Sequence, residues 1–272
     1  MNCSKVISNI RSNFKNYMIS NNLKSVVLGI SGGIDSALCA ALLKPVMDEL
    51  NLPLIGLSLP TKSNKSNENH RANDIGLYFC KNFHCYDIDQ TCDGVYDDIR
   101  SEFGNNVDNR NTIYKGNVKA RIRMINLYAI AGLNNGMVIS TDNYSELMLG
   151  FWTLHGDVGD YGPIQSLWKT EVYELAKYLV EDLTNSGHLK QANALMACVN
   201  ADATDGLGVS NTSLEQIGAD SWEQVDNILK SYLRGDIQKN NEMEQKVIDR
   251  HLNSQYKRNN PYNISREDLF KD

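Results

Sequence analysis

The sequence predicts an α/β fold with a doubly wound, mostly parallel sheet, helices on both of its faces and a helical C-terminal part. In the first half of the chain, short apolar runs alternate with stretches of helical periodicity, which is typical of parallel strands joined by helices. After about Ser166 only helical patterns follow. The chain has 272 residues, 42% of them hydrophobic, and shows no repeat or linker, so we expect one domain over residues 1–272.

The elements are expected where the residue pattern changes. The expected strands cover residues 26–30, 54–59, 84–88 and 137–141. An amphipathic helix is expected near the N-terminus, where apolar residues recur at every fourth position from 6 to 18, and further helices near 37–50, 70–81, 94–103, 115–133, 170–183, 221–233 and 241–253. Pro45 should kink or divide the second of these helices, because proline lacks the N–H that a helix interior needs. Right-handed crossovers would bring every strand-to-helix loop to the carboxyl edge of the sheet, where such folds bind ligands.

Composition excludes several classes of protein. Lys and Arg total 27 against 33 Asp and Glu, and a net charge of −6 does not favour a nucleic-acid partner. No apolar window reaches the roughly 18 residues that a membrane span needs, and polar residues interrupt the N-terminal stretch, unlike a secretory signal. The six cysteines lack the spacing of a zinc site. We therefore expect reduced thiols and a cytoplasmic location.

The most informative segment reads LGISGGIDSA, residues 28–37, between an expected strand and an expected helix. Gly32 and Gly33 allow positive φ and let backbone N–H groups approach an anion, and the helix N-terminus adds to that attraction. The two serines supply hydroxyl donors, and Asp35 is a candidate Mg²⁺ ligand. The segment matches neither the usual P-loop nor the dinucleotide-binding glycine pattern. The alternative reading is a glycine turn that only caps a helix.

SGGIDS resembles the pyrophosphatase loop of the N-type ATP pyrophosphatases. Further blocks make the chain similar to NAD synthetases over nearly its whole length, namely KGNVKARIRMINLYAIAG, STDNYSELMLGFWTLHGDVGD, PIQSLWKTEVYELAKYL, DGLGVSNTSLEQIGA and YKRNNP. The resemblance implies an adenine nucleotide α-hydrolase-like fold and a homodimer. It also implies the ATP-dependent amidation of deamido-NAD (nicotinate adenine dinucleotide) with ammonia. The product is NAD, formed through an adenylated intermediate with release of AMP and pyrophosphate, with Mg²⁺ as cofactor and ATP as co-substrate.

The resemblance also implies roles for single residues. The implied ATP contacts are Gly29, Ile30, Ser31, Gly32, Gly33, Ile34, Asp35, Ser36, Thr141, Lys169 and Thr204. The implied contacts to the nicotinate substrate are Arg121, Leu154, Asp160, Tyr256 and Lys257. Asp35 and Glu146 are the implied Mg²⁺ ligands, and Lys169 is an implied catalytic residue. Our own hypothesis is that Asp157, in the glycine-flanked HGDVGD loop, binds ammonium and takes its proton, because only neutral ammonia is a nucleophile.

The local pattern supports some of these roles and leaves alternatives for others. Glu146 follows an expected strand closely, which places it at the carboxyl edge, although a solvated glutamate at a helix start has the same pattern. A lysine at a helix start opposes the helix dipole, so the position of Lys169 favours a functional reading. The helical spacing of Arg121 from Met124 and Ile125 predicts that it lies on or beside an apolar face, with Arg123 at the surface.

Two positions depart from the pattern of NAD synthetases. Leu154 stands where a lysine normally touches the dinucleotide, and Tyr256 stands for the histidine of a His-Lys pair. Nicotinate mononucleotide, giving NMN, is therefore an alternative substrate for the same chemistry. A non-catalytic adenine-nucleotide-binding module is the alternative of another class. A tRNA-modifying ATP pyrophosphatase is disfavoured by net charge and cysteine spacing. With 272 residues we expect free ammonia, and not glutamine, as the nitrogen source.

Overall fold

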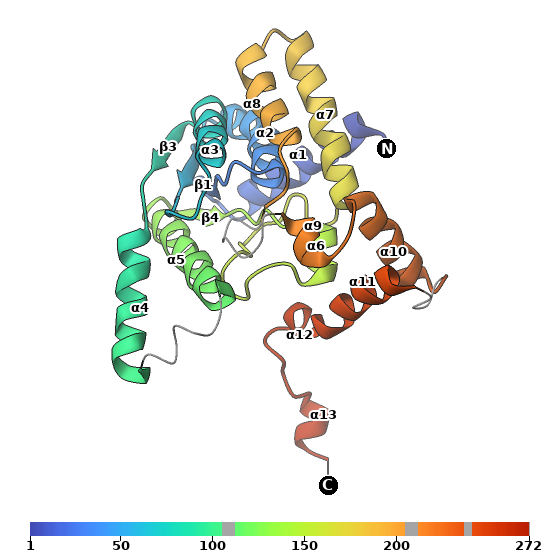
Figure 1. Cartoon of the computed structure of the whole chain (residues 1–272). Helices are drawn as coiled ribbons and strands as arrows, with labels where there is room; N and C mark the ends of the chain where they lie inside the picture. The colour runs from blue at the N-terminus through green and yellow to red at the C-terminus, as the bar shows by residue number, and fades with distance from the viewer. Residues whose placement is uncertain (105–111, 205–211, 237–240, 272) are drawn as a thin grey trace.

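The computed structural model describes residues 1–104, 112–204, 212–236 and 241–271 (Figure 1). Within them, a four-stranded parallel sheet has the order β3-β2-β1-β4. The strands are β1 (Ser25–Gly29), β2 (Leu54–Ser58), β3 (Asn82–Cys85) and β4 (Gly136–Val138). These strands confirm the predicted parallel sheet, and each begins within two residues of its expected start. Residues 105–111, between the helices expected near 94–103 and 115–133, and residues 205–211 lie outside the described residues.

β1 lies where the strand order reverses. Val27 pairs with Ile55 of β2 on one side and with Val138 of β4 on the other, so the chain winds away from β1 in both directions. In open α/β sheets, the loops diverge at such a point and leave a crevice beyond the carboxyl end of the strand. The segment SGGIDS follows β1 directly and therefore lies at this crevice.

Alternating side chains of β1 feed two separate apolar cores. Val26 and Leu28 are buried in one core, while Val27 belongs to the other, as expected for neighbours that point to opposite faces of a sheet. Helices cover both faces (Figure 1). The first core is closed by α1 (Cys3–Ser20), α2 (Ile34–Glu49), α3 (Ser66–Phe79), α7 (Lys169–Asn185) and α8 (Leu189–Val199). The second is closed by α4 (Asp89–Phe103) and α5 (Thr112–Leu133).

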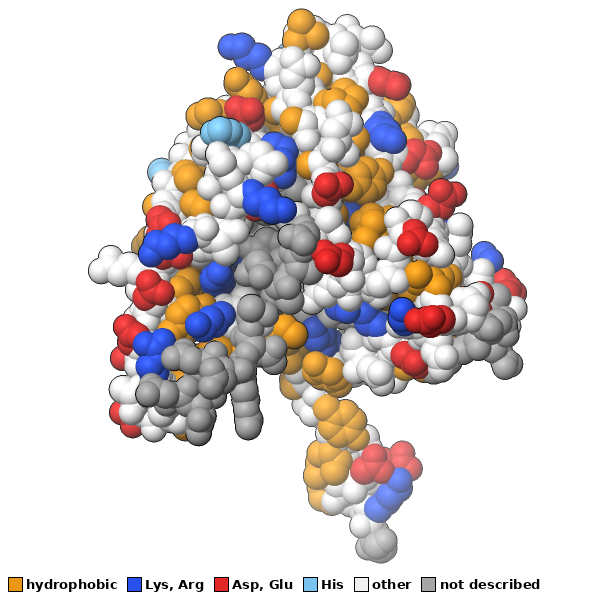
Figure 2. Space-filling view, in the orientation of Figure 1, with side chains coloured by type: hydrophobic (Ala, Val, Ile, Leu, Met, Phe, Trp, Pro, Cys, Tyr) orange, Lys and Arg blue, Asp and Glu red, His pale blue; other side chains and the backbone are white. Residues whose placement is uncertain are grey.

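A third apolar cluster holds the C-terminal part of the chain against a short helix that follows β4. It includes Leu149, Val225, Leu229 and Val247. The helices of this part are α6 (Tyr144–Leu149), α9 (Ser213–Ile217), α10 (Trp222–Arg234), α11 (Glu242–Asn253), α12 (Gln255–Arg258) and α13 (Arg266–Leu269). The last of them projects away from the body and carries exposed apolar side chains (Figures 1 and 2). None of the described helices is long and apolar enough to cross a bilayer.

α2 continues through Pro45, so the prediction that proline could divide this helix is wrong. Pro45 cannot donate to the carbonyl oxygen of Ala41, four residues earlier. Arg11 of α1 donates to that oxygen through Nη2 at 3.4 Å and to the carbonyl oxygen of Leu42 through Nε at 3.1 Å. The guanidinium thus replaces the missing backbone donor, and the helix that follows SGGIDS remains in one piece.

Candidate active site

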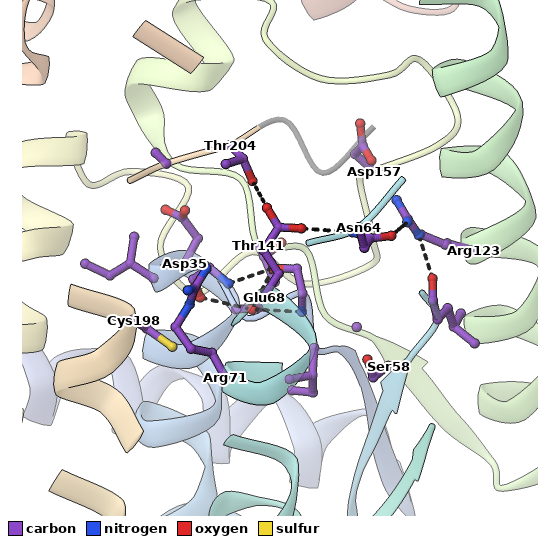
Figure 3. A pocket seen from close by; sticks show the side chains of 18 of the residues that line it. Asp35, Ser58, Asn64, Glu68, Arg71, Arg123, Thr141, Asp157, Cys198 and Thr204 are labelled. Atoms are coloured by element: carbon purple, nitrogen blue, oxygen red, sulfur yellow. Dashed lines mark hydrogen bonds between the residues drawn. The ribbon is translucent and has the colours of Figure 1, made fainter. Parts of the chain in front are cut away.

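A cavity opens beyond the carboxyl ends of β1, β2 and β4 (Figure 3). Most residues for which the sequence implied ATP or metal contacts line it. These are Gly29, Ile30, Ser31, Gly33, Ile34, Asp35, Ser36, Thr141, Glu146, Lys169 and Thr204, and Asp157 lines it too. Residues far apart in the sequence thus meet at the predicted edge of the sheet.

The segment SGGIDS forms a tight loop that ends in the N-terminus of α2. Gly32 has φ +80°, and a Cβ there would lie 2.3 Å from the carbonyl oxygen of Glu68 on α3, so only glycine fits. Gly32 does not line the cavity, and its carbonyl oxygen accepts a hydrogen bond from Arg71 Nε at 2.8 Å. The Ser31 and Ser36 hydroxyl oxygens lie 3.0 Å apart and brace the turn. The loop therefore presents backbone N–H groups of a helix start to the cavity, which suits an anion such as phosphate.

Lys169 is the buried centre of an ionic cluster whose two carboxylates are partly exposed. Its Nζ lies 2.6 Å from Asp35 Oδ2 and 3.0 Å from Glu146 Oε1, and its side chain is 1% exposed. Burial disfavours the ammonium charge, but the two carboxylates outweigh burial and raise the pKa of Lys169 above its ordinary value. Burial also raises the pKa of Glu146 to about 7, even though Lys169 opposes the rise. Two carboxylates thus share one ammonium, and the cluster has an excess of negative charge.

One amide side chain connects the two carboxylates. Asn143 Nδ2 donates to Asp35 Oδ1 at 2.9 Å. Asn143 Oδ1 accepts from the Glu146 N–H at 3.0 Å, and Glu146 Oε2 accepts from the Asn143 N–H at 3.3 Å, which forms a capping box at the start of α6. The interlocked bonds fix the spacing between Asp35 and Glu146.

The ionic cluster fits a magnesium–nucleotide complex. Mg²⁺ in nucleotide enzymes is usually held by one or two carboxylates together with substrate phosphates and water. Asp35 and Glu146 supply two carboxylates beside a phosphate-compatible loop, and their excess of negative charge suits a divalent cation. Within the described residues, no group of three or more His, Cys, Asp or Glu gathers into a metal site of its own. The donor set therefore fits a cation that arrives with a polyphosphate.

The carboxylates of Asp142 and Asp157 also line the cavity. Asp157 Oδ2 accepts from the backbone N–H of Thr153, and burial raises the pKa of Asp157 although this hydrogen bond and Arg123 oppose the rise. Asp142 accepts from Ser140 Oγ at 2.8 Å, and burial raises its pKa well above the ordinary value. A carboxylate whose pKa is raised in this way binds protons more strongly than an exposed aspartate, as a proton acceptor in a site must.

The sequence reasoning missed a polar network on the other wall of the cavity (Figure 3). Glu68 is 6% exposed, and its carboxylate accepts from Thr204 Oγ1 at 2.9 Å and from Asn64 Nδ2 at 3.2 Å. Asn64 Oδ1 in turn accepts from Arg123 Nη2 at 3.2 Å. The network joins α3, α5 and the residues before α9. No local pattern could have predicted it, because its members are far apart in the sequence.

The two arginines of α5 take the opposite places to those expected. Arg123 was expected at the surface, but it lines the cavity and donates to the carbonyl oxygen of Leu59 at 3.0 Å. Its spacing from buried Ala120 and Leu127 was the available signal. Arg121 was expected on or beside an apolar face, but it is exposed and does not line the cavity. Its neighbour Ile125 is 67% exposed, so their common face points to solvent.

The remaining residues with implied substrate contacts lie outside the cavity lining. The carbonyl oxygen of Leu154 accepts from Arg121 Nε at 3.1 Å. Asp160 is exposed and links the edge strand β4 to α5. Its Oδ2 accepts from the Val138 N–H at 2.9 Å, and its Oδ1 accepts from Tyr128 Oη at 2.8 Å. Lys257 Nζ donates to the carbonyl oxygen of Gly150 at 2.7 Å, and Tyr256 is 64% exposed. The structure thus gathers the ATP and metal candidates without the substrate candidates.

Comparison with known proteins identifies the family of this chain. The family described as NAD synthase matches residues 6–261. A relative from Finegoldia magna, named NH(3)-dependent NAD(+) synthetase, is 35% identical and covers 84% of this chain and 85% of its own. A relative of the same name from Thermoplasma acidophilum is 32% identical, covering 89% and 91%.

Solved structures share the fold. An NH3-dependent NAD synthetase from Campylobacter jejuni superposes with a TM-score of 0.72 at 26% identity, covering 97% of this chain and all of its own (100%). An NMN synthetase from Francisella tularensis has a TM-score of 0.78 at 24% identity, covering 95% and 96%. At that identity, the second likeness shows the fold alone.

Proposed function

The chain belongs to the NAD synthase family of enzymes, and we propose that it amidates deamido-NAD with ammonia to give NAD at the expense of ATP. The observation that carries this proposal is the cluster of Asp35, Glu146 and the buried Lys169 beside the loop at the start of α2. A helix that merely needed a glycine cap would not require two carboxylates around one buried ammonium. The cluster therefore disfavours the plain glycine turn.

The proposed first step makes the carboxylate reactive. An oxygen of the nicotinate carboxylate attacks the α-phosphorus of ATP, an O–P bond forms, and the bond to the bridging oxygen breaks so that pyrophosphate leaves with the electron pair. N–H groups at the start of α2 would bind the departing phosphates. Lys169 would hold Asp35 and Glu146 in place, and these two carboxylates would hold Mg²⁺. Mg²⁺, when bound, neutralises charge on the phosphates.

In the proposed second step, Asp157 accepts a proton from ammonium. The neutral ammonia attacks the acyl carbon, a C–N bond forms, the C–O bond to AMP breaks with its electron pair going to AMP, and the nitrogen releases its surplus proton to solvent to give the amide. Asp157 is suited to this role because it lines the cavity and its pKa is raised by burial. The backbone bond from Thr153 fixes its orientation.

The experiment that tests the proposed function measures AMP formation from ATP, Mg²⁺ and ammonium chloride with either deamido-NAD or nicotinate mononucleotide. Faster turnover of deamido-NAD supports the proposal. Faster turnover of the mononucleotide makes the chain an NMN-forming enzyme with the same chemistry. If ATP binds but neither substrate yields AMP, the amidation proposal is wrong and a non-catalytic nucleotide-binding module takes its place.

Replacing Asp157 with asparagine is expected to slow the ammonia step about a hundredfold, because Asn keeps the size and one acceptor oxygen but cannot take the proton. Pyrophosphate release in a single turnover should stay close to the wild-type rate. Rapid-quench measurement of pyrophosphate and amide separates the two steps. Asp220→Asn, at an exposed position outside the cavity lining, is the matched control. Equal rates of amide formation in D157N and D220N would remove Asp157 from the mechanism.

A second substrate is favoured by Leu154, an apolar residue at a position where the resemblance to NAD synthetases implies a lysine. A lysine would add a cation opposite the pyrophosphate of the dinucleotide, and nicotinate mononucleotide has no pyrophosphate. Leu154→Lys is expected to raise kcat/KM for deamido-NAD about tenfold relative to the mononucleotide. Leu154→Met, apolar and of similar size, is the control. The specificity role fails if L154K and L154M have the same substrate ratio.

We also propose that the enzyme is a homodimer. α5 exposes Ile125, Tyr128 and Leu133, which are 67%, 43% and 79% exposed and apolar or largely so. Such side chains on one helix are typical of a surface that a partner covers, and a stable dimer buries more than about 1,000 Å² in total. Light scattering at micromolar concentration should give twice the chain mass, and a monomer would contradict the proposal.

A further inference from the structure

α10 contacts Lys169, the centre of the ionic cluster, through the ring of Trp222. Its residues Trp222 and Asp226 are four positions apart, so both side chains lie on one face of the helix. Neither is among the residues that line the cavity. Both are buried, with 7% exposure for Trp222 and 0% for Asp226. Whatever they contribute to the site, they contribute through the residues they contact.

Asp226 binds the backbone at the start of α7. Its Oδ2 accepts from the Thr170 N–H at 2.9 Å and from Thr170 Oγ1 at 2.8 Å. Its Oδ1 accepts from Ser145 Oγ, which itself accepts from the Lys169 N–H at 2.8 Å. The first two N–H groups of α7 are therefore satisfied through one carboxylate of another helix. A negative charge is also favoured at this end of a helix.

The same contacts reach Lys169 and Glu146, the two members of the ionic cluster that lie outside α2. Lys169 is the first residue of α7, and Ser145 directly precedes Glu146 on α6. Trp222 adds a contact to the Lys169 side chain, because Nζ lies 5.2 Å from the centre of its ring. Asp226 thus fixes the backbone from which Lys169 and Glu146 extend, while Trp222 packs against the ammonium.

A carboxylate without solvent contact needs compensation. The desolvation of a buried charge is costly unless hydrogen bonds satisfy it, and three donors converge on Asp226. An apolar residue would fill the space but would leave Ser145 and Thr170 without their acceptor. The geometry therefore relates Asp226 to the alignment of α6 with α7 and not merely to the apolar packing of α10.

We propose that Asp226 is a positioning residue which, with Trp222, sets where the Lys169 ammonium and the Glu146 carboxylate lie in the active site. This inference rests on the proposed function for its kinetic test and on ATP binding for its second test. A misplacement of about 1 Å at a catalytic group can reduce a rate about a hundredfold, so small shifts of α7 have large consequences.

The test compares Asp226→Asn with Leu229→Ala. Asn keeps the size of Asp but replaces one of its two acceptor oxygens with an NH2 group. It therefore cannot accept hydrogen bonds on both sides, from Ser145 and from Thr170. Leu229 lies one turn further along α10, is 0% exposed and belongs to the apolar cluster, so L229A destabilises the helix without touching Lys169 or Ser145. Glu223→Gln, at an exposed position of α10, controls for the loss of charge.

D226N is expected to lower kcat about a hundredfold while KM for the nicotinate substrate stays within about twofold. L229A is expected to lower Tm at least as much as D226N does but to keep kcat within about threefold of the wild type. The proposal would be overturned if D226N and L229A had the same Tm and lost the same factor in kcat. It would also be overturned if D226N were as active as E223Q.

Ser145→Ala supplies an independent check of the route. If Asp226 acts through Ser145, the double variant S145A/D226N is as active as the less active of the two single variants. A loss equal to the product of both single losses would overturn the route. If the wild type itself forms no AMP, the proposed function fails, and calorimetric ATP affinity then decides the inference alone. About tenfold weaker ATP binding by D226N than by L229A supports it, and equal affinities overturn it.

Discussion

Replacing Lys169 with methionine is expected to lower kcat for AMP formation at least about a thousandfold and to destabilise the fold by about 3–5 kcal/mol. Lys169 is the one ammonium shared by Asp35 and Glu146 at 2.6 and 3.0 Å. Methionine fills a similar volume but leaves two partly buried carboxylates without that cation. Steady-state kinetics and urea unfolding measure the two effects separately.

Lys177→Met is the matched control, because Lys177 lies exposed on the same helix and the substitution removes the same charge. We expect K177M to stay within about 0.5 kcal/mol of the wild type. Mg²⁺ together with ATP should restore part of the stability of K169M, since a cation that binds the folded state stabilises it. A K169M enzyme that keeps a tenth of its activity would show that Lys169 does not organise the site.

Gly32→Ala is expected to weaken ATP binding at least about a hundredfold and to cost about 3 kcal/mol of stability. Gly32 has φ +80°, and the added Cβ would lie 2.3 Å from the carbonyl oxygen of Glu68 and 3.0 Å from the backbone nitrogen of Ala72. Both contacts are with the backbone of α3, which cannot rotate away as a side chain could. The loop must therefore move, and its N–H groups would no longer be oriented to donate to the phosphates. Calorimetry with ATP measures the affinity.

Gly33→Ala is the comparison, because the neighbouring residue has φ −89° and its added Cβ would meet only Ser31 Oγ, at an ordinary 3.4 Å. We expect G33A to weaken ATP binding at least tenfold less than G32A does. Equal losses in the two variants would mean that any added methyl group harms the loop, and that the approach of Gly32 to α3 has no special importance.

The sequence predicted the sheet better than it predicted the walls of the site. Parallel strands and their order of appearance follow from local alternation of apolar runs and helices, and the loop after β1 follows from the position of SGGIDS at a strand end. A functional role for Lys169 was predicted from its poor fit to a helix start, and this role stays a prediction. That it is buried between Asp35 and Glu146 depends on three distant segments meeting, which no local pattern encodes.

The arginines of α5 show a second limit. Arg121 and Arg123 both have apolar neighbours at helical spacing, and only the direction of the helix axis over the sheet decides which one turns inward. Glu68 offered no signal, because an acidic residue in the first turn of a helix is usual at a solvated surface. Here it accepts bonds from Asn64 and Thr204 inside the cavity.

Because Arg11 binds two carbonyl groups near Pro45, the N-terminal helix α1 should be kept when the protein is shortened for expression. Arg11 of α1 donates to the carbonyl oxygen of Ala41, which Pro45 cannot reach, and Ala41 and Leu42 are 5% and 0% exposed. A shortened version that begins after Ser20 would remove the Arg11 donor from the buried carbonyl oxygen of Ala41 and weaken the helix that follows the phosphate loop. The N-terminal ammonium also pairs with Glu174 at 2.8 Å. Affinity tags on this enzyme are therefore better attached to the projecting C-terminal end.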